Sequence, residues 1–132
     1  MKYRFDPING DSYQIIKAVM ASPEVEPYPD LEFKLRLCVE EVAENIASYA
    51  YPQNLGWAEV STDIEGDDLI ISFRDEGIPF NPLDKPDPDI TLSAEERKIG
   101  GLGIFLCKQM MDELTYKFED GCNILTMKIK VK

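Results

Sequence analysis

Three groups of residues along this chain have types and spacings that could do chemistry on a nucleotide. A carboxylate and an amide stand four residues apart in Glu41-Val42-Ala43-Glu44-Asn45. An aspartate opens the segment Asp75-Glu76-Gly77-Ile78-Pro79-Phe80-Asn81-Pro82, and glycines gather in Gly100-Gly101-Leu102-Gly103. In this order the groups could supply a general base, an oxygen ligand for Mg²⁺, an acceptor for an adenine amino group and backbone donors for phosphates.

Each group also has an ordinary structural explanation when it is taken alone. Glu41 and Asn45 lie on one face of a predicted helix, and many helix surfaces carry such polar residues. Asp and Gly dominate turns, and glycines before a helix can be a simple connection. The glycine cluster is neither a P-loop, since no Gly-Lys-Ser/Thr follows, nor the six-residue dinucleotide fingerprint. The functional interpretation therefore depends on all three groups occurring together.

Composition narrows the class of protein. The 132 residues predict one domain over 1–132, and 44% hydrophobic with 30% charged residues is a composition that can fold around a core. The formal net charge of −11 opposes nucleic-acid phosphates and anionic membrane surfaces, so we expect neither as a partner. No apolar signal region or spanning stretch is present, and we expect a cytoplasmic protein.

Histidine and cysteine usage excludes several kinds of site. With no histidine, the chain cannot form a Ser-His-Asp triad, a Cys-His pair, a histidine-containing zinc site or a phosphohistidine. Three distant cysteines without CxxC spacing argue against a disulfide framework or a zinc ribbon. We predict that Cys38 and Cys107 lie in the core and that Cys122, which follows a turn, is exposed.

Two long helices and a shorter one should position these residues. Apolar residues recur every three or four positions at Leu35, Val39, Val42, Ile46 and Tyr49, which predicts a helix over 31–50. A second helix is predicted over 102–113, with four residues expected to be buried, namely Ile104, Phe105, Met110 and Met111. A shorter helix is predicted from about residue 13 to residue 20.

Alternating apolar and polar residues predict strands at 2–6, 58–64, 69–74, 115–118 and 125–131. Tight turns between them favour antiparallel pairing with one face exposed to water. We therefore predict an α+β fold, a two-layer sandwich with the helices on one face of a mostly antiparallel sheet. Residues 83–99 are expected to be a proline-rich lid with a helical turn near Ser93.

Taken together, these segments make the chain resemble a GHKL-type ATPase domain, the Bergerat or histidine-kinase-like ATPase fold. More narrowly, it resembles the anti-sigma-factor serine/threonine kinases of bacterial partner-switching systems. The segment 41–45 matches the asparagine box of that family, 75–82 its first glycine box with the Pro-Phe-x-Pro extension, and 101–106 its second glycine box. The similarity runs from about Leu31 to the C-terminus, whereas residues 1–30 match only in outline. The chain departs from the pattern where the family often has a histidine, a region that Tyr49 occupies here, and in its short lid.

The resemblance implies a role for each matching residue. Glu41 would be the general base, and Asn45 would ligate Mg²⁺. Asp75 would accept a hydrogen bond from the adenine, which Gly77 would allow to approach closely. The remaining nucleotide-binding residues implied are Pro79, Phe80, Gly101, Leu102, Gly103, Ile104 and, near the adenine, Thr126. Arg97 and Lys98 are the cations nearest in sequence to the phosphate-binding segment, although they can also be read as solvated charges.

The resemblance also implies an activity and partners. The expected protein is an ATP-dependent serine/threonine kinase and anti-sigma factor, a regulator of transcription and a homodimer. It would phosphorylate an anti-sigma-factor antagonist and sequester a sigma factor, with ATP and Mg²⁺ bound. Two alternatives stay open at this stage: an ATP-binding module with negligible kinase activity, and the catalytic domain of a split histidine kinase. A gyrase-like machine is disfavoured, because the chain has no transducer domain.

Overall fold

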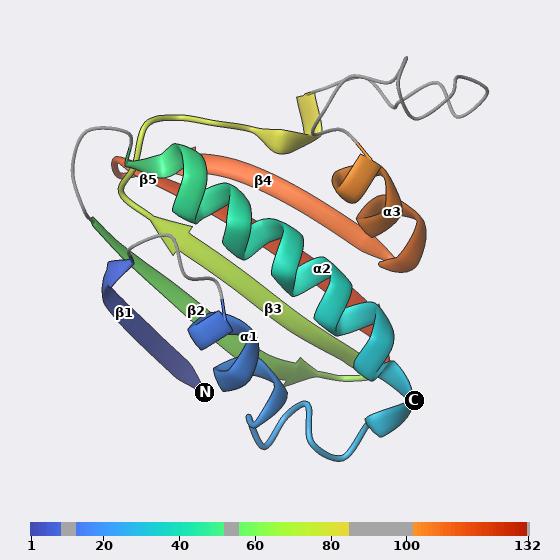
Figure 1. Cartoon of the computed structure of the whole chain (residues 1–132). Coiled ribbons are helices and arrows are strands. Elements are labelled where there is room, and N and C mark those ends of the chain that lie inside the picture. Colours follow the sequence, from blue (N-terminus) through green and yellow to red (C-terminus); the bar gives the residue numbers. More distant parts are fainter. Residues whose placement is uncertain (9–12, 52–55, 85–101, 132) are drawn as a thin grey trace.

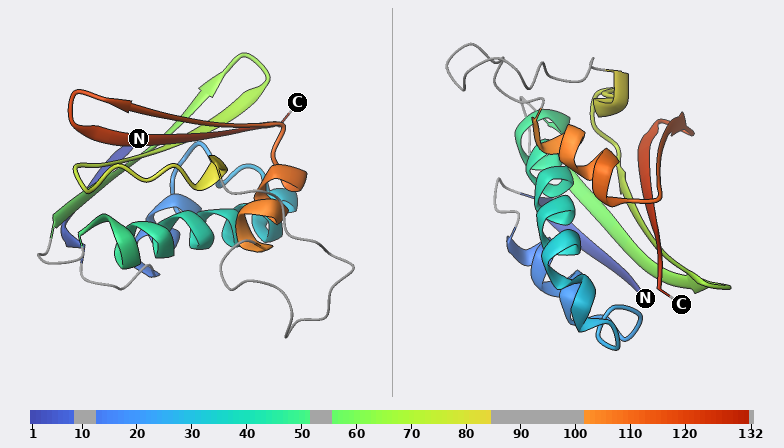
Figure 2. Two further views of the ribbon diagram at one scale, coloured as in Figure 1. Left: turned by 90° about the horizontal axis from the view of Figure 1, so that it is seen from above. Right: turned by 90° about the vertical axis from the view of Figure 1, so that its right-hand side faces the viewer.

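The computed structural model describes residues 1–8, 13–51, 56–84 and 102–131, and these form one antiparallel sheet covered on one face by helices (Figures 1 and 2). The strands are β1 (Lys2–Ile8), β2 (Gly56–Glu65), β3 (Asp68–Asp75), β4 (Glu113–Glu119) and β5 (Cys122–Lys130). The helices are α1 (Tyr13–Met20), α2 (Glu32–Asn45) and α3 (Leu102–Met110). The α+β sandwich predicted from the sequence is confirmed, and so is the order of its elements.

The sheet has the strand order β1-β2-β3-β5-β4, so that β3 is the central strand. Its register aligns Val60, Phe73 and Leu125 in one row across β2, β3 and β5. All three side chains are buried, which identifies this face as the one that packs on the helices. Because side chains alternate along a strand, Asp75 and Asn123 form the next row on the same face, directly opposite each other.

The apolar stripe of α2 supplies the centre of the core. Leu35, Val39, Val42 and Ile46 are all buried, as the helical spacing predicts. Tyr49, predicted to continue this stripe, is instead 49% exposed, and Ala50 is buried in its place. The cause is a π-helical turn over Ile46–Ala50, whose wider winding moves the buried face on by one residue.

Helix α3 is shorter than predicted, because it ends at Met110 and the chain enters β4 at Glu113. Ile104 and Met111 are buried as expected, whereas Phe105 and Met110 are only partly buried. The expected helical turn near Ser93 lies outside the described residues. None of the helices in the described part of the chain is long and apolar enough to cross a bilayer.

The three cysteines are free thiols in the interior. Cys38 on α2 and Cys107 on α3 are fully buried, as predicted. The prediction that Cys122 is exposed is wrong, because this residue is the first of β5 and only 1% of its surface is exposed. The neighbouring Cys38 thiol raises the pKa of the Cys107 thiol, and so do burial and the negative charge of Glu41.

Candidate functional site

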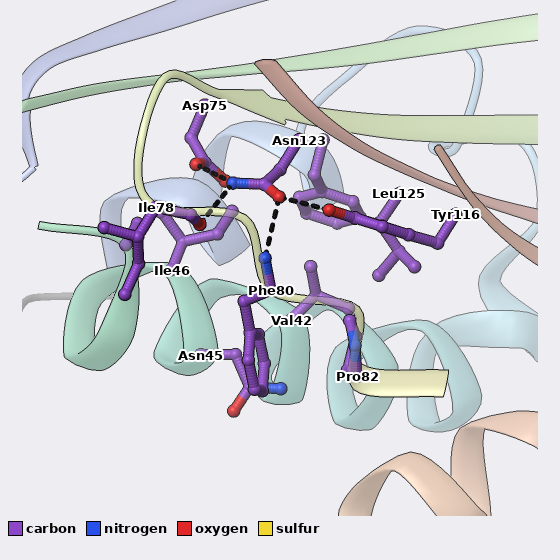
Figure 3. Close-up of a pocket in the computed structure, with 12 residues that line it drawn as sticks. Val42, Asn45, Ile46, Asp75, Ile78, Phe80, Pro82, Tyr116, Asn123 and Leu125 are labelled. Atoms are coloured by element: carbon purple, nitrogen blue, oxygen red, sulfur yellow. Dashed lines mark hydrogen bonds between the residues drawn. The ribbon is translucent and has the colours of Figure 1, made fainter. Parts of the chain in front are cut away.

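A cleft opens between the C-terminal half of α2, the adjacent ends of β3 and β5, and the segment that follows β3 (Figure 3). It is partly open to solvent, and its cavity volume is about 40 Å³. Like small-molecule sites in general, it combines apolar walls with a few polar groups. Twelve residues line the cleft: Val42, Asn45, Ile46, Ala50, Phe73, Asp75, Ile78, Phe80, Pro82, Tyr116, Asn123 and Leu125.

Asp75 is the acidic group of this cleft. It ends β3 and is only 5% exposed. Its Oδ1 accepts hydrogen bonds from the Asn123 amide and from the Gly77 N–H, both at 2.9 Å. Burial raises the pKa of the Asp75 carboxyl above its usual range, and these two hydrogen bonds oppose that rise because they favour the ionised form.

Asn123 and Tyr116 are cleft residues that the sequence analysis did not identify. Asn123 stands opposite Asp75 on β5, and its Oδ1 accepts hydrogen bonds from the Tyr116 hydroxyl and, at 3.1 Å, from the Phe80 N–H. Its Nδ2 donates to the Ile78 carbonyl at 2.9 Å as well as to Asp75 (Figure 3). The signal that could have found Asn123 is the alternation along β5, in which 123, 125, 127 and 129 share the buried face.

The segment after Asp75 is held by residues 49–51, at the end of the π-helical turn. Hydrogen bonds join the Glu76 N–H to the Tyr51 hydroxyl at 2.8 Å and the Ile78 N–H to the Ala50 carbonyl at 2.9 Å. Gly77 packs so closely on the end of the π-helical turn that a Cβ there would lie 2.3 Å from the Ala50 carbonyl oxygen. The Phe80 ring contacts the Tyr49 ring with 5.5 Å between centroids.

The predicted general base lies beside the first turn of α3. Glu41 is on α2, partly buried, and a Cβ added to Gly103 would lie 2.2 Å from its Oε2. The structure therefore brings together the asparagine-box carboxylate and the second glycine box, which are 62 residues apart. Asn45, one helical turn after Glu41, lines the same cleft as Asp75 and lies beside Phe80 (Figure 3). Both residues thus belong to one edge of α2, as their spacing predicts.

The other predicted site residues lie in different places, some beside the cleft and some away from it. Pro79 is exposed between two lining residues, and Ile104 is buried within α3. Leu102 begins α3, whereas Gly101, Arg97 and Lys98 lie outside the described residues. Thr126 is not brought to the cleft. It lies on the opposite face of the sheet, where its hydroxyl pairs with that of Ser72 at 3.0 Å, because it is one residue out of phase with the buried row.

The donor set suits a magnesium nucleotide. A buried carboxylate beside an apolar cleft can accept hydrogen bonds from an amino-bearing base, and the walls can cover the flat faces of its ring. The amide oxygen of Asn45 is a hard ligand of the type that Mg²⁺ prefers, and this cation usually takes few protein ligands beside phosphates. The N-terminal turn of α3 offers backbone N–H groups and the positive end of a helix dipole to anions.

Known proteins match this chain over most of its length. The sequence profile of the histidine kinase-like ATPase domain matches residues 13–129. The serine/threonine-protein kinase BtrW of Bordetella bronchiseptica is 29% identical over 98 residues, which cover 74% of this chain and 69% of that protein. The serine-protein kinases RsbW of Bacillus cereus (strain AH187) and Bacillus mycoides (strain KBAB4) are 27% identical over 129 residues, or 92% of this chain and 80% of theirs. The chain belongs to the histidine kinase-like ATPase family.

Proposed function

We propose that the protein is an ATP-dependent protein serine/threonine kinase of the anti-sigma-factor type, acting in the cytoplasm. The observation that carries this proposal is the contact of the Glu41 carboxylate with Gly103, next to a cleft that contains Asn45 and Asp75. A nucleotide whose base lies at Asp75 would extend its phosphates along α2 toward Gly103. The carboxylate would then be beside the terminal phosphate, where an acceptor hydroxyl must lose its proton.

The reaction follows from that placement. The oxygen of a serine or threonine hydroxyl attacks the γ-phosphorus of ATP, and the bond from this phosphorus to the β–γ bridging oxygen breaks, which releases ADP. Glu41 accepts the hydroxyl proton as the new P–O bond forms. Positioning and charge neutralisation contribute most of the catalysis in such transfers, so the geometry of Glu41 matters more than its strength as a base.

Each remaining residue has a binding role in this proposal. Asp75 accepts a hydrogen bond from the exocyclic amino group of adenine, and Gly77 lets the base approach the backbone. The first turn of α3, from Leu102 through Gly103, faces the phosphates, and Ile104 anchors that turn in the core. The Asn45 amide oxygen would hold a Mg²⁺ ion, which supplies positive charge to the phosphate oxygens.

The proposed protein substrate is an anti-sigma-factor antagonist, and the proposed second partner is a sigma factor that the protein sequesters as a homodimer. Phosphorylation of a serine is supported by the similarity to the serine-protein kinases RsbW, whose name gives serine as the residue they modify. Regulation of transcription would follow from release of the sigma factor when the antagonist is unphosphorylated.

The test is transfer of labelled γ-phosphate from ATP to an antagonist encoded beside this protein. We expect the wild type to label a serine or threonine and Glu41→Gln to be slower by about 100-fold or more, the usual range for loss of a positioned base. Glu40→Gln is the matched control, because Glu40 is the exposed neighbour on the same helix. Equal transfer by Glu41→Gln and wild type would remove the assigned role. Binding of ATP and both partners without any transfer would leave an ATP-dependent binding module.

A further inference from the structure

The Asn123 side chain uses all of its hydrogen-bonding capacity inside the protein. Its two N–H groups point to Asp75 Oδ1 and the Ile78 carbonyl, both 2.9 Å away, with the Gly77 carbonyl at 3.4 Å. Its oxygen accepts from the Phe80 N–H and the Tyr116 hydroxyl. An amide can make four such bonds, so Asn123 has none left to offer a nucleotide. Any effect of Asn123 on a ligand must therefore act through its neighbours.

The orientation of this amide is fixed by its backbone partners. The Phe80 N–H can only donate and the Ile78 carbonyl can only accept, so the oxygen must face Phe80 and the nitrogen must face Ile78. The nitrogen side is also the side of Asp75. Asn123 consequently always presents an N–H to the carboxylate, and Tyr116 reinforces that orientation from β4.

One oxygen of Asp75 accepts two hydrogen bonds. Within the described part of the chain, the Asn123 amide and the Gly77 N–H both donate to Oδ1, so Oδ2 is the acceptor that a base can use. Burial works against the ionised form, which these two donors favour. The charge of Asp75, and with it the ability to accept from an amino group, thus depends on Asn123.

We propose that Asn123, oriented by Tyr116 and Phe80, is the positioning residue that sets the preference of this cleft for an amino-bearing purine. An ionised Asp75 can accept a hydrogen bond from the N6 amino group of adenine, whereas it repels O6 of guanine, which is also an acceptor. A protonated Asp75 can donate to O6, and the discrimination is lost. This inference rests on the proposed function, because it assumes that the cleft binds the base of a nucleotide.

The experiment measures binding of Mg-ATP and Mg-GTP to the full chain between pH 5 and pH 8. The variants are Asn123→Ala, the isosteric Asn123→Asp and Tyr116→Phe. Ser72→Ala is the control, because Ser72 lies on the opposite face of the same sheet and also loses one hydrogen bond. Circular dichroism shows whether each variant is folded.

We expect Asn123→Ala to weaken ATP binding at pH 7 by about tenfold, the effect of a hydrogen bond to a charged group, and to weaken GTP binding much less. The pH below which ATP binding is lost should rise, because the Asp75 carboxyl has lost a donor that stabilises its charge. It should rise further in Asn123→Asp, where two carboxylates face each other and share a proton. Tyr116→Phe should reduce ATP affinity by about threefold, as expected for one neutral hydrogen bond. In this variant the pH below which ATP binding is lost should rise less than in the Asn123 variants.

Equal losses for ATP and GTP at an unchanged pH midpoint would show that Asn123 is merely structural and would overturn the proposal. If the Asn123 variants do not fold, Tyr116→Phe tests the proposal in their place. An ATP affinity and a pH dependence equal to those of the wild type would then overturn the proposal as well. A wild-type protein that binds ATP selectively but transfers no phosphate would refute the kinase activity and leave this inference intact. A wild type that binds no nucleotide would refute both.

Discussion

The segment after β3 and the first turn of α3 each place a glycine against another part of the fold, but the neighbours differ in kind. A Cβ at Gly77 would lie 2.3 Å from a backbone carbonyl oxygen, that of Ala50. A Cβ at Gly103 would lie 2.2 Å from a side-chain oxygen, that of Glu41. A backbone in a packed helical turn cannot yield, whereas a carboxylate can rotate away. Two close approaches of nearly equal distance therefore impose different constraints.

Hydrogen bonding separates the two regions in the same way. From residue 76 to residue 80, every backbone N–H has a partner: Tyr51 for Glu76, Asp75 for Gly77, Ala50 for Ile78 and Asn123 for Phe80, while Pro79 has no N–H to donate. The base side of the cleft is thus built before any ligand arrives. On the phosphate side, what faces Gly103 is the carboxylate that the proposed reaction needs, so this region combines binding with chemistry.

The largest effect on stability is expected from Gly77→Ala. The new methyl group must displace the backbone at Ala50, which we expect to lower the free energy of unfolding by about 1–3 kcal/mol, as overpacking usually does. Because Gly77 also donates to Asp75, ATP affinity should fall by more than about tenfold. Urea unfolding and nucleotide titration measure the two effects. If the variant has the stability and the ATP affinity of the wild type, the segment after β3 moves freely, and the difference drawn here between Gly77 and Gly103 is wrong.

Gly103→Ala should separate the two regions. Glu41 must turn away from the added methyl group, so phosphate transfer should fall by about 100-fold, as it does when a general base is misplaced. Stability should change by less than about 1 kcal/mol, since alanine is favoured over glycine within a helix. ATP affinity should stay within about threefold of wild type. A loss of ATP binding equal to that of Gly77→Ala would show that both glycines serve the same purpose.

The sequence predicted these two regions unequally well. Helical spacing placed Glu41 and Asn45 on one edge of α2, and strand alternation placed Asp75 at the end of β3, because both patterns are local and periodic. The contact between Glu41 and Gly103 required the packing of α3 against α2, which no local pattern encodes. It was predictable only through the resemblance to a family.

The errors have local physical causes. Thr126 was assigned to the adenine site although its neighbours Leu125 and Met127 define the buried face of β5, so the alternation itself places it outside. Asn123 follows the turn at Asp120 and Gly121, and asparagine beside a turn is typical of a loop. For this reason the sequence did not predict that Asn123 lines the cleft. The exposure of Tyr49 follows from a π-helical turn, a change of winding that apolar spacing does not reveal.

Asp75 should make stability and binding respond to pH in opposite directions. Burial raises the pKa of the folded Asp75 carboxyl above its usual value, so between these two pKa values the folded protein retains a proton that the unfolded chain has lost. The Asp75 contribution to the free energy of unfolding therefore grows as pH falls through this window, by at most about 1.4 kcal/mol per pH unit, while ATP binding is lost. The difference between wild type and Asp75→Asn in urea unfolding measures the contribution of Asp75 to the free energy of unfolding. Asp84→Asn, a change at an exposed residue near the cleft, is the control. Parallel pH profiles for wild type and Asp75→Asn would contradict the raised pKa.

The smallest effect marks where the base-binding region ends. Thr126→Val keeps the branched shape of the side chain and removes only the hydroxyl that pairs with Ser72 on the outer face of the sheet. One such hydrogen bond contributes about 0.5–1.5 kcal/mol, so urea unfolding should show a loss of that size. ATP affinity should be unchanged, because three residues earlier in β5 Asn123 already occupies the place opposite Asp75. A fall in ATP affinity beyond threefold would instead extend the base-binding region through the sheet to its other face, and the rigid segment after Asp75 would no longer account for recognition by itself.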